Sequence, residues 1–477
     1  MDGASLSSST RGSLQYRSNT NLDARKSDWV SLWFCNLLLY ANGLQMSLYF
    51  TSMWPYLLKL DPNAQLPFFG IILSSFSFGQ AIGSPIFGTW TQKSERFKVP
   101  ISTGLVICAT GNLFYALLPT IDWEPQWMML VARVIVGVGA GNLSGLRAYT
   151  SACSTLEDRG RAVSLSIGSM VTGMLTGPIL QTAFAFIGDG VRIFGTIDID
   201  CYTSPAYFLA IFLLLMVAIV FVYFSENYAG IIDEKAEQCD VKIPDFDRLA
   251  AFTCIYLWFV IQTIAVNIES LCTVFTIAMY NWTSHESIIY NGYIETASCF
   301  ISVSQYLVLG LTRVGKLDKR YHIIFGTIVF SIYYLVLLPW PFYTGKLDYD
   351  PNATDGACTY AWCQYVPRVP FIAYLFVYIV CFGIAFPYIG NSIGTLYSEI
   401  LGPRQQGTMQ GVFAFVGSVG RCFAPLATTA IFNASGYTWI SVELLCFVLF
   451  GGFLCILFWK RLVPLKLISV STVYKDA

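Results

Sequence analysis

The sequence predicts an all-α membrane protein whose twelve transmembrane helices form two related six-helix halves. Of its 477 residues, 55% are apolar and only 12% are charged, which is about half the charged share of an ordinary soluble domain. Apolar segments of about twenty residues recur along the chain, and a helix of that length crosses a hydrocarbon core about 30 Å thick. These segments are continuously apolar, whereas the strands of a membrane barrel alternate apolar and polar residues. Helices are therefore the predicted spanning elements.

The predicted spans follow a polar segment, residues 1–28, which we expect to be a disordered cytosolic tail. The first span is too long, and has the wrong flanks, for a cleaved signal peptide. In order, the spans cover residues 29–57, 67–91, 99–119, 127–150, 162–187, 204–224, 250–280, 286–311, 321–343, 369–397, 408–432 and 437–459.

The longest polar loop between spans, residues 225–248, separates six spans from six. We therefore expect an N-terminal bundle at 29–224, a cytosolic linker at 225–248 and a C-terminal bundle at 249–460, followed by a cytosolic tail at 461–477. An internal repeat supports this division, because three residues of the first half recur in the second at one constant offset. Gly160, Gly173 and Pro178 correspond in this way to Gly407, Gly420 and Pro425.

Basic residues are concentrated on one side of the predicted bundle. The loops on that side and the two tails hold 21 of the 28 Lys and Arg residues, whereas the opposite loops hold four. Because basic loops stay in the cytosol when helical membrane proteins insert, the pattern predicts that both termini are cytosolic. The basic loops are 92–98, 151–161, 225–249, 312–320 and 398–407, and the four opposite residues are Lys59, Arg192, Lys346 and Arg368.

The opposite loops carry glycosylation sequons, which are used only on the lumenal or extracellular side. They begin at Asn281, Asn352 and Asn433. Asn281 and Asn433 lie very near predicted helix ends, where the glycosylation enzyme has poor access. Asn352 is therefore the best candidate.

Cys358 and Cys363 lie in the same polar loop as Asn352. A local disulfide between them would persist in an oxidising lumen. Two free thiols, or a bond from one of them to Cys201, are the alternatives that the sequence leaves open.

Glycines in the fourth and fifth spans occur at spacings that let helix backbones approach closely. Tight packing alone explains such residues, but helices that rock against each other also need smooth faces. A buried proline can in addition kink its helix. The residues are Gly137, Gly139, Gly141, Gly173, Gly177 and Pro178.

Six charged residues lie inside predicted spans, where each costs about 3 kcal/mol or more at the bilayer centre. Such residues need a partner or water and are candidates for a functional site. A rise of about 1.5 Å per residue places Glu295 and Arg421 near mid-depth and Arg147 near the cytosolic end, where its side chain can reach water. The six residues are Arg133, Arg147, Glu269, Glu295, Arg421 and Glu443.

The loop after the second span contains Gly88, Lys93 and Arg96, with Gln92 directly before the lysine. A glycine, a spaced aspartate and a basic cluster in this loop are the signature of the major facilitator superfamily, which the chain resembles. The resemblance implies two six-helix halves that expose a central site to each side of the membrane in turn. It also implies an acid that holds the end of a neighbouring helix, and Gln92 departs from that pattern.

Four further segments resemble lysosomal members of this superfamily, namely residues 49–57, 84–88, 137–142 and 400–407. This narrower resemblance implies a late endosomal or lysosomal membrane. It also implies that the solute is a small anion such as chloride.

In the superfamily fold the eighth and eleventh helices line the same half of the cavity, so we expect an ion pair between Glu295 and Arg421. That pair would hold the second half together, or Arg421 would attract an anion while Glu295 or Glu269 exchanges a proton. Arg133 would guide anions into the cavity or brace helix packing. Glu443 would be structural, because the twelfth helix lies at the periphery of this fold.

The sequence predicts no enzyme, no cofactor and no metal site. It has no phosphate-binding glycine loop, its histidines His285 and His322 lie far apart, and no nucleophile has a base partner. A net charge of −1 gives no support for nucleic-acid binding. The expected partners are membrane lipid and a small-molecule or ion substrate, and no particular oligomeric state is predicted. The alternatives to a transporter are a chloride channel on the same fold and a non-transporting scaffold.

Overall fold

The structure of the chain is a computed structural model. It describes residues 26–49, 52–61, 66–121, 123–155, 157–185, 187, 191–193, 197–226, 228–229, 241–242, 244–350, 357–358, 360–466 and 468–469. All structural statements below concern these residues.

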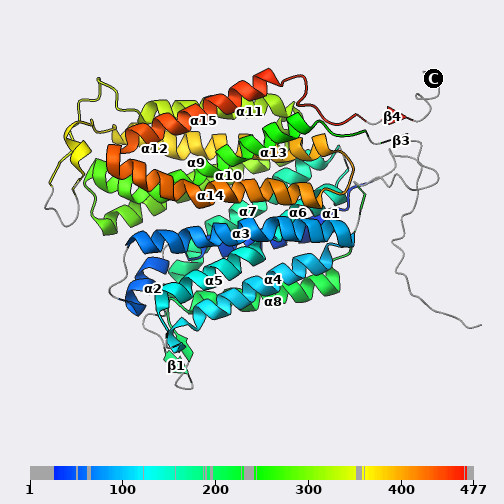
Figure 1. The fold of residues 1–477 in the computed structure, drawn as a ribbon, viewed down its shortest axis with the longest axis horizontal. Coiled ribbons are helices and arrows are strands. Elements are labelled where there is room, and N and C mark those ends of the chain that lie inside the picture. Colours follow the sequence, from blue (N-terminus) through cyan, green and yellow to red (C-terminus); the bar gives the residue numbers. More distant parts are fainter. Residues whose placement is uncertain are drawn as a thin grey trace, which may run out of the picture.

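Helices dominate the structure, and they form two bundles that lie side by side (Figure 1). The N-terminal bundle contains α1 (Trp29–Ser47), α2 (Met53–Leu60), α3 (Leu66–Ser94), α4 (Lys98–Ala116), the short helix η2 (Leu118–Thr120), α5 (Pro125–Ala140), α6 (Leu143–Cys153), α7 (Arg159–Ala185), the hairpin of β1 (Val191–Ile193) and β2 (Ile197–Ile199), and α8 (Ser204–Tyr223). The C-terminal bundle contains α9 (Arg248–Tyr280), α10 (Ser284–Leu311), η3 (Arg313–Lys316), α11 (Lys319–Leu337), η4 (Ala361–Gln364), α12 (Phe371–Phe376), the π-helical segment η5 (Val377–Phe382), α13 (Gly383–Leu401), α14 (Gly407–Ser435) and α15 (Tyr437–Leu457). Strands β3 (Val241–Lys242) and β4 (Ile468–Ser469) pair outside the bundles.

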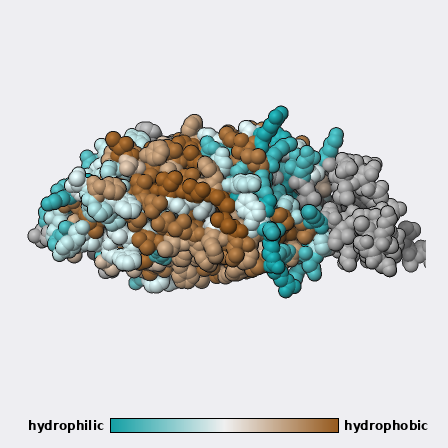
Figure 2. All heavy atoms as spheres, turned by 90° about the horizontal axis from the view of Figure 1, so that it is seen from above, coloured by the Kyte–Doolittle hydropathy of each residue, from teal (hydrophilic) through white to brown (hydrophobic). Residues whose placement is uncertain are grey.

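Eleven helical segments in the described part of the chain are long and apolar enough to cross a membrane. The fourth span consists of α5 and α6, and the tenth consists of α12, η5 and α13. The remaining predicted span, residues 29–57, corresponds to α1 and α2. The twelve-span all-α prediction is therefore confirmed. On the face seen in Figure 2, apolar side chains form a broad band with hydrophilic side chains toward both ends.

Both described ends of the chain lie at one end of the bundle, which we call the terminal end; the other end carries β1 and β2 and is called the hairpin end (Figure 1). Side-chain caps fix where several helices begin. Asp28, Asp247 and Asp318 accept hydrogen bonds from the first backbone N–H groups of α1, α9 and α11. Thr283 and Glu286 form a capping box at the start of α10. These bonds satisfy donors that the first turn of a helix leaves open.

Within each half, neighbouring helices pack closely along their length. In the N-terminal half α1 packs on α7, and α5 packs on α3 and α4. In the C-terminal half α9 packs on α14, and α11 packs on α13 and α15. The halves meet where α3 lies against α14 and α7 lies against α10, and Figure 1 shows α3 and α14 side by side at the centre.

The glycines singled out in the sequence lie where a neighbouring helix leaves no room for a side chain. A Cβ atom added to Gly137 would lie 2.1 Å from the carbonyl oxygen of Phe76, and one added to Gly173 would lie 2.2 Å from that of Tyr40. Added Cβ atoms would lie 2.7 Å, 2.4 Å, 2.1 Å and 2.8 Å from their nearest neighbours at Gly139, Gly141, Gly177 and Gly420. Pro425 lies inside α14. Pro178 lies inside α7, and its side chain is outside the described set.

The loop between α11 and α12 closes the hairpin end of the C-terminal half. Cys358 and Cys363 form a disulfide, which was one of the alternatives the sequence left open. Asp348 pairs with Arg368 at 3.2 Å and accepts a hydrogen bond from Asn281. The loop is thus tied both to itself and to the end of α9.

Of the three sequons, one begins directly after a helix and one lies inside a helix. Asn281 ends α9 in a left-handed conformation with φ of 54°, and Asn433 lies inside α14. Asn352 is outside the described residues, so its glycosylation stays a prediction.

At the hairpin end of the N-terminal half, Lys59 donates a hydrogen bond of 2.7 Å to Asp200. Burial by itself would raise the pKa of Asp200, but bonds from Lys59 and from the backbone of Thr203 and Tyr202 hold that pKa below its usual value. This cluster ties α2 to the segment that leads into α8.

We predict that Gly137→Val destabilises the protein by about 1–3 kcal/mol or more, because backbone atoms of α3 would have to move away from α5. The matched control is Gly292→Ala in α10, where an added Cβ meets nothing within 4 Å. Thermal unfolding and size-exclusion profiles of both variants in detergent would measure the effect. An unchanged melting temperature for Gly137→Val would contradict the packing argument.

Candidate functional site

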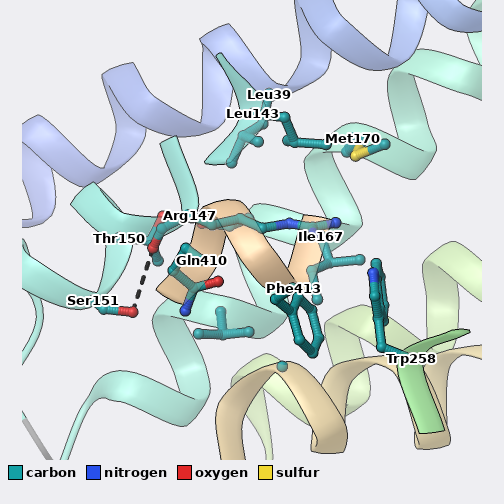
Figure 3. Close-up of a pocket in the computed structure, with 13 residues that line it drawn as sticks. Leu39, Leu143, Arg147, Thr150, Ser151, Ile167, Met170, Trp258, Gln410 and Phe413 are labelled. Atoms are coloured by element: carbon teal, nitrogen blue, oxygen red, sulfur yellow. Dashed lines mark hydrogen bonds between the residues drawn. The ribbon is translucent and has the colours of Figure 1, made fainter. Parts of the chain in front are cut away.

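A pocket lies between the two halves (Figure 3). Ser151 near the end of α6 and Gln410 near the start of α14 place it toward the terminal end. Six helices border it, with α1, α6 and α7 from the N-terminal half and α9, α13 and α14 from the C-terminal half. The residues that line it are Leu39, Leu143, Arg147, Thr150, Ser151, Val163, Ser166, Ile167, Met170, Trp258, Gly394, Gln410 and Phe413. Arg147 is the one charged residue in this lining.

Arg421 lies at the midpoint of α14 and is 5% exposed. Its guanidinium donates a hydrogen bond to the Oε1 atom of Gln80, which lies at the midpoint of α3 in the other half. A second nitrogen lies 3.4 Å from the sulfur of Met46, and Nε has no partner among the described residues. The buried charge therefore faces a neutral amide across the interface between the halves.

Gln80 connects the two halves at this level. Its Oε1 atom accepts bonds from Arg421 and from Ser418, the latter at 3.3 Å, and its Nε2 atom lies 3.4 Å from the carbonyl oxygen of Ala140. We did not select Gln80 from the sequence. An uncharged amide inside an apolar span is the signal that could have identified it.

Arg147 does not extend to the surface, which corrects the expectation drawn from its depth in the fourth span. Its guanidinium lies 4.6 Å from the ring centre of Trp258 and 5.8 Å from that of Phe413. These two rings are stacked at 4.7 Å, and Phe413 stacks in turn on Tyr397 at 4.6 Å. Helix α6 points the side chain into the pocket, where the opposite half provides the aromatic surface (Figure 3).

The charges of Arg147 and Arg421 are close enough to repel each other. Two positive charges that act on each other in low-dielectric surroundings are each less stable than either would be alone. The arrangement is therefore suited to a negatively charged partner.

The expected ion pair between Glu295 and Arg421 is not formed. The salt bridges of the described residues include neither Glu295 nor Glu269. Glu269 is the acid whose charge interacts with that of Arg421, and it also interacts with the charge of Glu295. Glu295 lies exposed on α10 beside Gly292, toward the hairpin end. Glu295 therefore lies on the expected helix, but Glu269 and not Glu295 is the acid whose charge acts on Arg421.

Arg133 lies apart from the other charged residues, inside the N-terminal half. It is 3% exposed, and its guanidinium lies 4.8 Å from the ring centre of Phe76 and 5.8 Å from that of Tyr49. Its Nε and Nη1 atoms have no partner among the described residues. Contact with aromatic rings favours a cation even without a carboxylate, so the geometry supports a packing role for this residue.

The two halves are in close contact at the terminal end. A Cβ atom added to Gly88 would lie 2.4 Å from the carbonyl oxygen of Gly407, so these two glycines touch across the interface. One turn further, the Oε1 atom of Gln92 accepts a hydrogen bond of 2.7 Å from the backbone N–H of Thr408. Gln92 thus caps the start of α14 with a neutral amide where the family signature has an acid. Lys93 and Arg96 are exposed beside it.

A second group of contacts seals the same end between α6, α7 and α13. Arg159 is 1% exposed and donates hydrogen bonds to the carbonyl oxygens of Ser398, at 3.2 Å, and Ser151, at 3.1 Å. The hydroxyl of Ser398 donates to that of Ser151 at 2.7 Å, and Ser164 donates to Asn391 at 3.0 Å. The sequence placed Arg159 in a basic loop and gave no sign of this buried role.

Comparison with known proteins agrees with this architecture. The model of the Major Facilitator Superfamily matches residues 34–425. Major facilitator superfamily domain-containing protein 8 of Xenopus laevis is 28% identical over 475 residues, which cover 92% of both chains. Among solved structures, the human organic anion transporter MFSD10 has a TM-score of 0.63 at 13% identity and covers 89% of this chain and 98% of its own. The proton:xylose symporter XylE has a TM-score of 0.66 at 15% identity, with coverage of 93% and 99%.

The match to the family covers most of the chain, and it includes the helices that carry Gln80, Arg147 and Arg421. The structural likeness extends over both halves. The chain belongs to the Major Facilitator Superfamily.

Proposed function

We propose that the chain carries a small anion across a late endosomal or lysosomal membrane by alternating access, with chloride as the smallest anion the site would take. The observation that carries the proposal is Arg421, whose buried charge faces the neutral Gln80 at the centre of the interface between the halves. A guanidinium keeps its charge under all physiological conditions and has several donors for an anion. Transport requires a site of this kind near the membrane midplane.

Electrostatics provides the reason for anion binding. Arg421 and Arg147 repel each other, and Glu269 balances one of the two charges only at a distance, without a salt bridge. An anion between the two arginines would balance the remaining positive charge.

Glu269 offers a means of coupling anion movement to a proton gradient. The negative charge of Glu269 is attracted to Arg421. An anion bound at Arg421 would be attracted to the same guanidinium, so a bound anion and an ionised Glu269 compete for it. Protonation of Glu269 removes the competition, because the neutral acid no longer repels the anion. The anion and the proton would then cross together. Glu295, whose charge interacts with that of Glu269 and which is exposed on α10, would pass the proton to or from Glu269.

The contacts at the terminal end support alternating access over a pore that is open at both ends. Gln92 on Thr408 and Arg159 on Ser398 close the path on that side. Both groups join one half to the other, so a rocking movement of the halves would break them.

The buried positive charges argue against a scaffold that does not transport. Charges at mid-depth are costly, and such a scaffold would have no need for them.

The orientation rests on the sequence. We infer that the terminal end faces the cytosol, because its loops and tails are basic. We also infer that the two halves are residues 29–224 and 249–460, with the linker 225–248 between them. The disulfide at the hairpin end fits an oxidising lumen. The late endosomal or lysosomal location rests on the resemblance of the sequence to lysosomal members of the family.

We predict that Arg421→Gln lowers anion uptake into proteoliposomes by about ten- to a hundredfold, because hydrogen bonds to a charged group contribute roughly 1.5–3 kcal/mol. Lys460→Gln removes one positive charge from the exposed terminal end and serves as the control with unchanged uptake. Equal uptake by the two variants would argue against Arg421 as the anion site.

For Glu269→Gln, we expect that anion exchange continues while the dependence of uptake on an imposed pH gradient disappears, since the amide cannot carry a proton. The comparison is made in the same vesicles with and without the gradient. Retention of a full response to the gradient would assign proton coupling to another residue.

Gln92→Ala should shift the protein toward a state open at the terminal end, and Gln92→Glu should favour the closed state by about 0.3–1 kcal/mol through the helix dipole. The readout is the rate at which an impermeant thiol reagent modifies a cysteine placed at Gln410, which is buried in the pocket. Glu157→Gln, in an exposed loop at the same end, is the control. If Gln92→Ala and the control label at the same rate, the contact to Thr408 does not hold the gate.

A further inference from the structure

The pocket that contains Arg147 has two kinds of surface. Its polar groups, among them Ser151 and Gln410, lie near the terminal end, where the halves are sealed. On the side of the N-terminal half, the surface facing Arg147 is formed by the apolar side chains of Leu39, Leu143 and Met170. A solute in this space would therefore meet one fixed positive charge and an apolar wall.

The guanidinium of Arg147 is held in a defined orientation. It rests against the stacked rings of Trp258 and Phe413, at 4.6 Å and 5.8 Å from their centres. Its central carbon lies over both rings, and its N–H groups make no hydrogen bond to another described residue. Because the group is only partly buried, those N–H groups remain accessible from the pocket. A planar fork that is already oriented loses little entropy when it binds a planar anion.

From these features we infer that the Arg147 pocket takes a carboxylate carried on a compact apolar body, such as a small aromatic or branched-chain acid. The inference rests on the proposed anion transport and names its substrate class. The carboxylate would accept two hydrogen bonds from Arg147, and the apolar body would lie against Leu143 and Met170. Ligand pockets commonly combine a mainly apolar lining with a few placed polar groups.

A chloride ion would use only part of this site. It can accept hydrogen bonds from Arg147, but it has no apolar surface to bury against Met170 and no plane to match the fork. Apolar contact area would contribute to the affinity of an organic acid and not to that of chloride. The pocket therefore distinguishes the two classes of anion through its wall as well as through its charge.

The test measures binding of benzoate, acetate and chloride to the full-length protein in lipid nanodiscs by calorimetry, with uncharged benzamide as the reference. We expect benzoate to bind at least about tenfold more tightly than acetate or chloride, which corresponds to about 1.4 kcal/mol, and benzamide not to bind detectably. Arg147→Lys keeps the charge but loses the forked pair of N–H donors. It should weaken benzoate binding by at least about tenfold. Met170→Gln keeps the size of the wall but makes it polar, and it should weaken benzoate without affecting acetate.

Arg161→Lys is the matched control, because Arg161 also lies over a tryptophan ring, that of Trp29 at 4.4 Å, but is exposed outside the pocket. Its benzoate affinity should equal that of the parent protein. Melting temperatures of all variants show whether each is folded.

The outcomes separate this inference from the proposed function. If chloride binds as tightly as benzoate, or if Met170→Gln weakens both equally, the substrate class is wrong while anion transport stands. Binding of palmitate in place of benzoate would also overturn the inference, since it would indicate a lipid acyl chain instead of a compact body. If no anion binds and Arg421→Gln leaves anion flux unchanged, the proposed function itself fails.

Discussion

The structure depends on a positive charge placed where the membrane is least able to solvate it. Arg421 and Gln80 lie at the midpoints of α14 and α3 and meet across the interface between the halves. A neutral amide accepts a hydrogen bond but does not neutralise the charge, and an uncompensated charge in such surroundings costs several kcal/mol. Glu269 reduces this cost from a distance without pairing. An anion of the kind we propose would stabilise this charge, and protonation of Glu269 would remove part of its compensation.

Close backbone packing brings together the helices that surround this charge. Gly137 brings α5 against α3, and Gly88 with Gly407 brings α3 against α14. Of these, only the Gly88–Gly407 contact crosses between the halves, and it would open when the polar contacts at the terminal end separate. Arg159 and Gln92 form those polar contacts with backbone atoms, which gives the seal a few well-defined bonds to break.

The fold was largely predictable because its main signal is simple. Runs of apolar residues of one length mark the spans, and the distribution of Lys and Arg predicts their orientation. The site was only partly predictable, because depth along a helix does not say which way a side chain points. Arg421 was assigned to mid-depth correctly, but its partner is the uncharged Gln80 and not Glu295. Arg147 lies toward the terminal end of its span, yet its guanidinium turns inward onto Trp258, a ring from the other half of the sequence. Contacts between residues so far apart in the sequence leave no local sequence pattern that would predict them.

The most direct test of the account is the net charge that the protein moves with each anion. Because a monovalent anion and the proton on Glu269 are argued to cross together, the pair carries no net charge. Uptake of the anion into proteoliposomes should therefore follow an imposed pH gradient and be unaffected by an imposed membrane potential. Uptake that rises and falls with the potential in the absence of a pH gradient would contradict the account, since it would mean that the anion crosses alone.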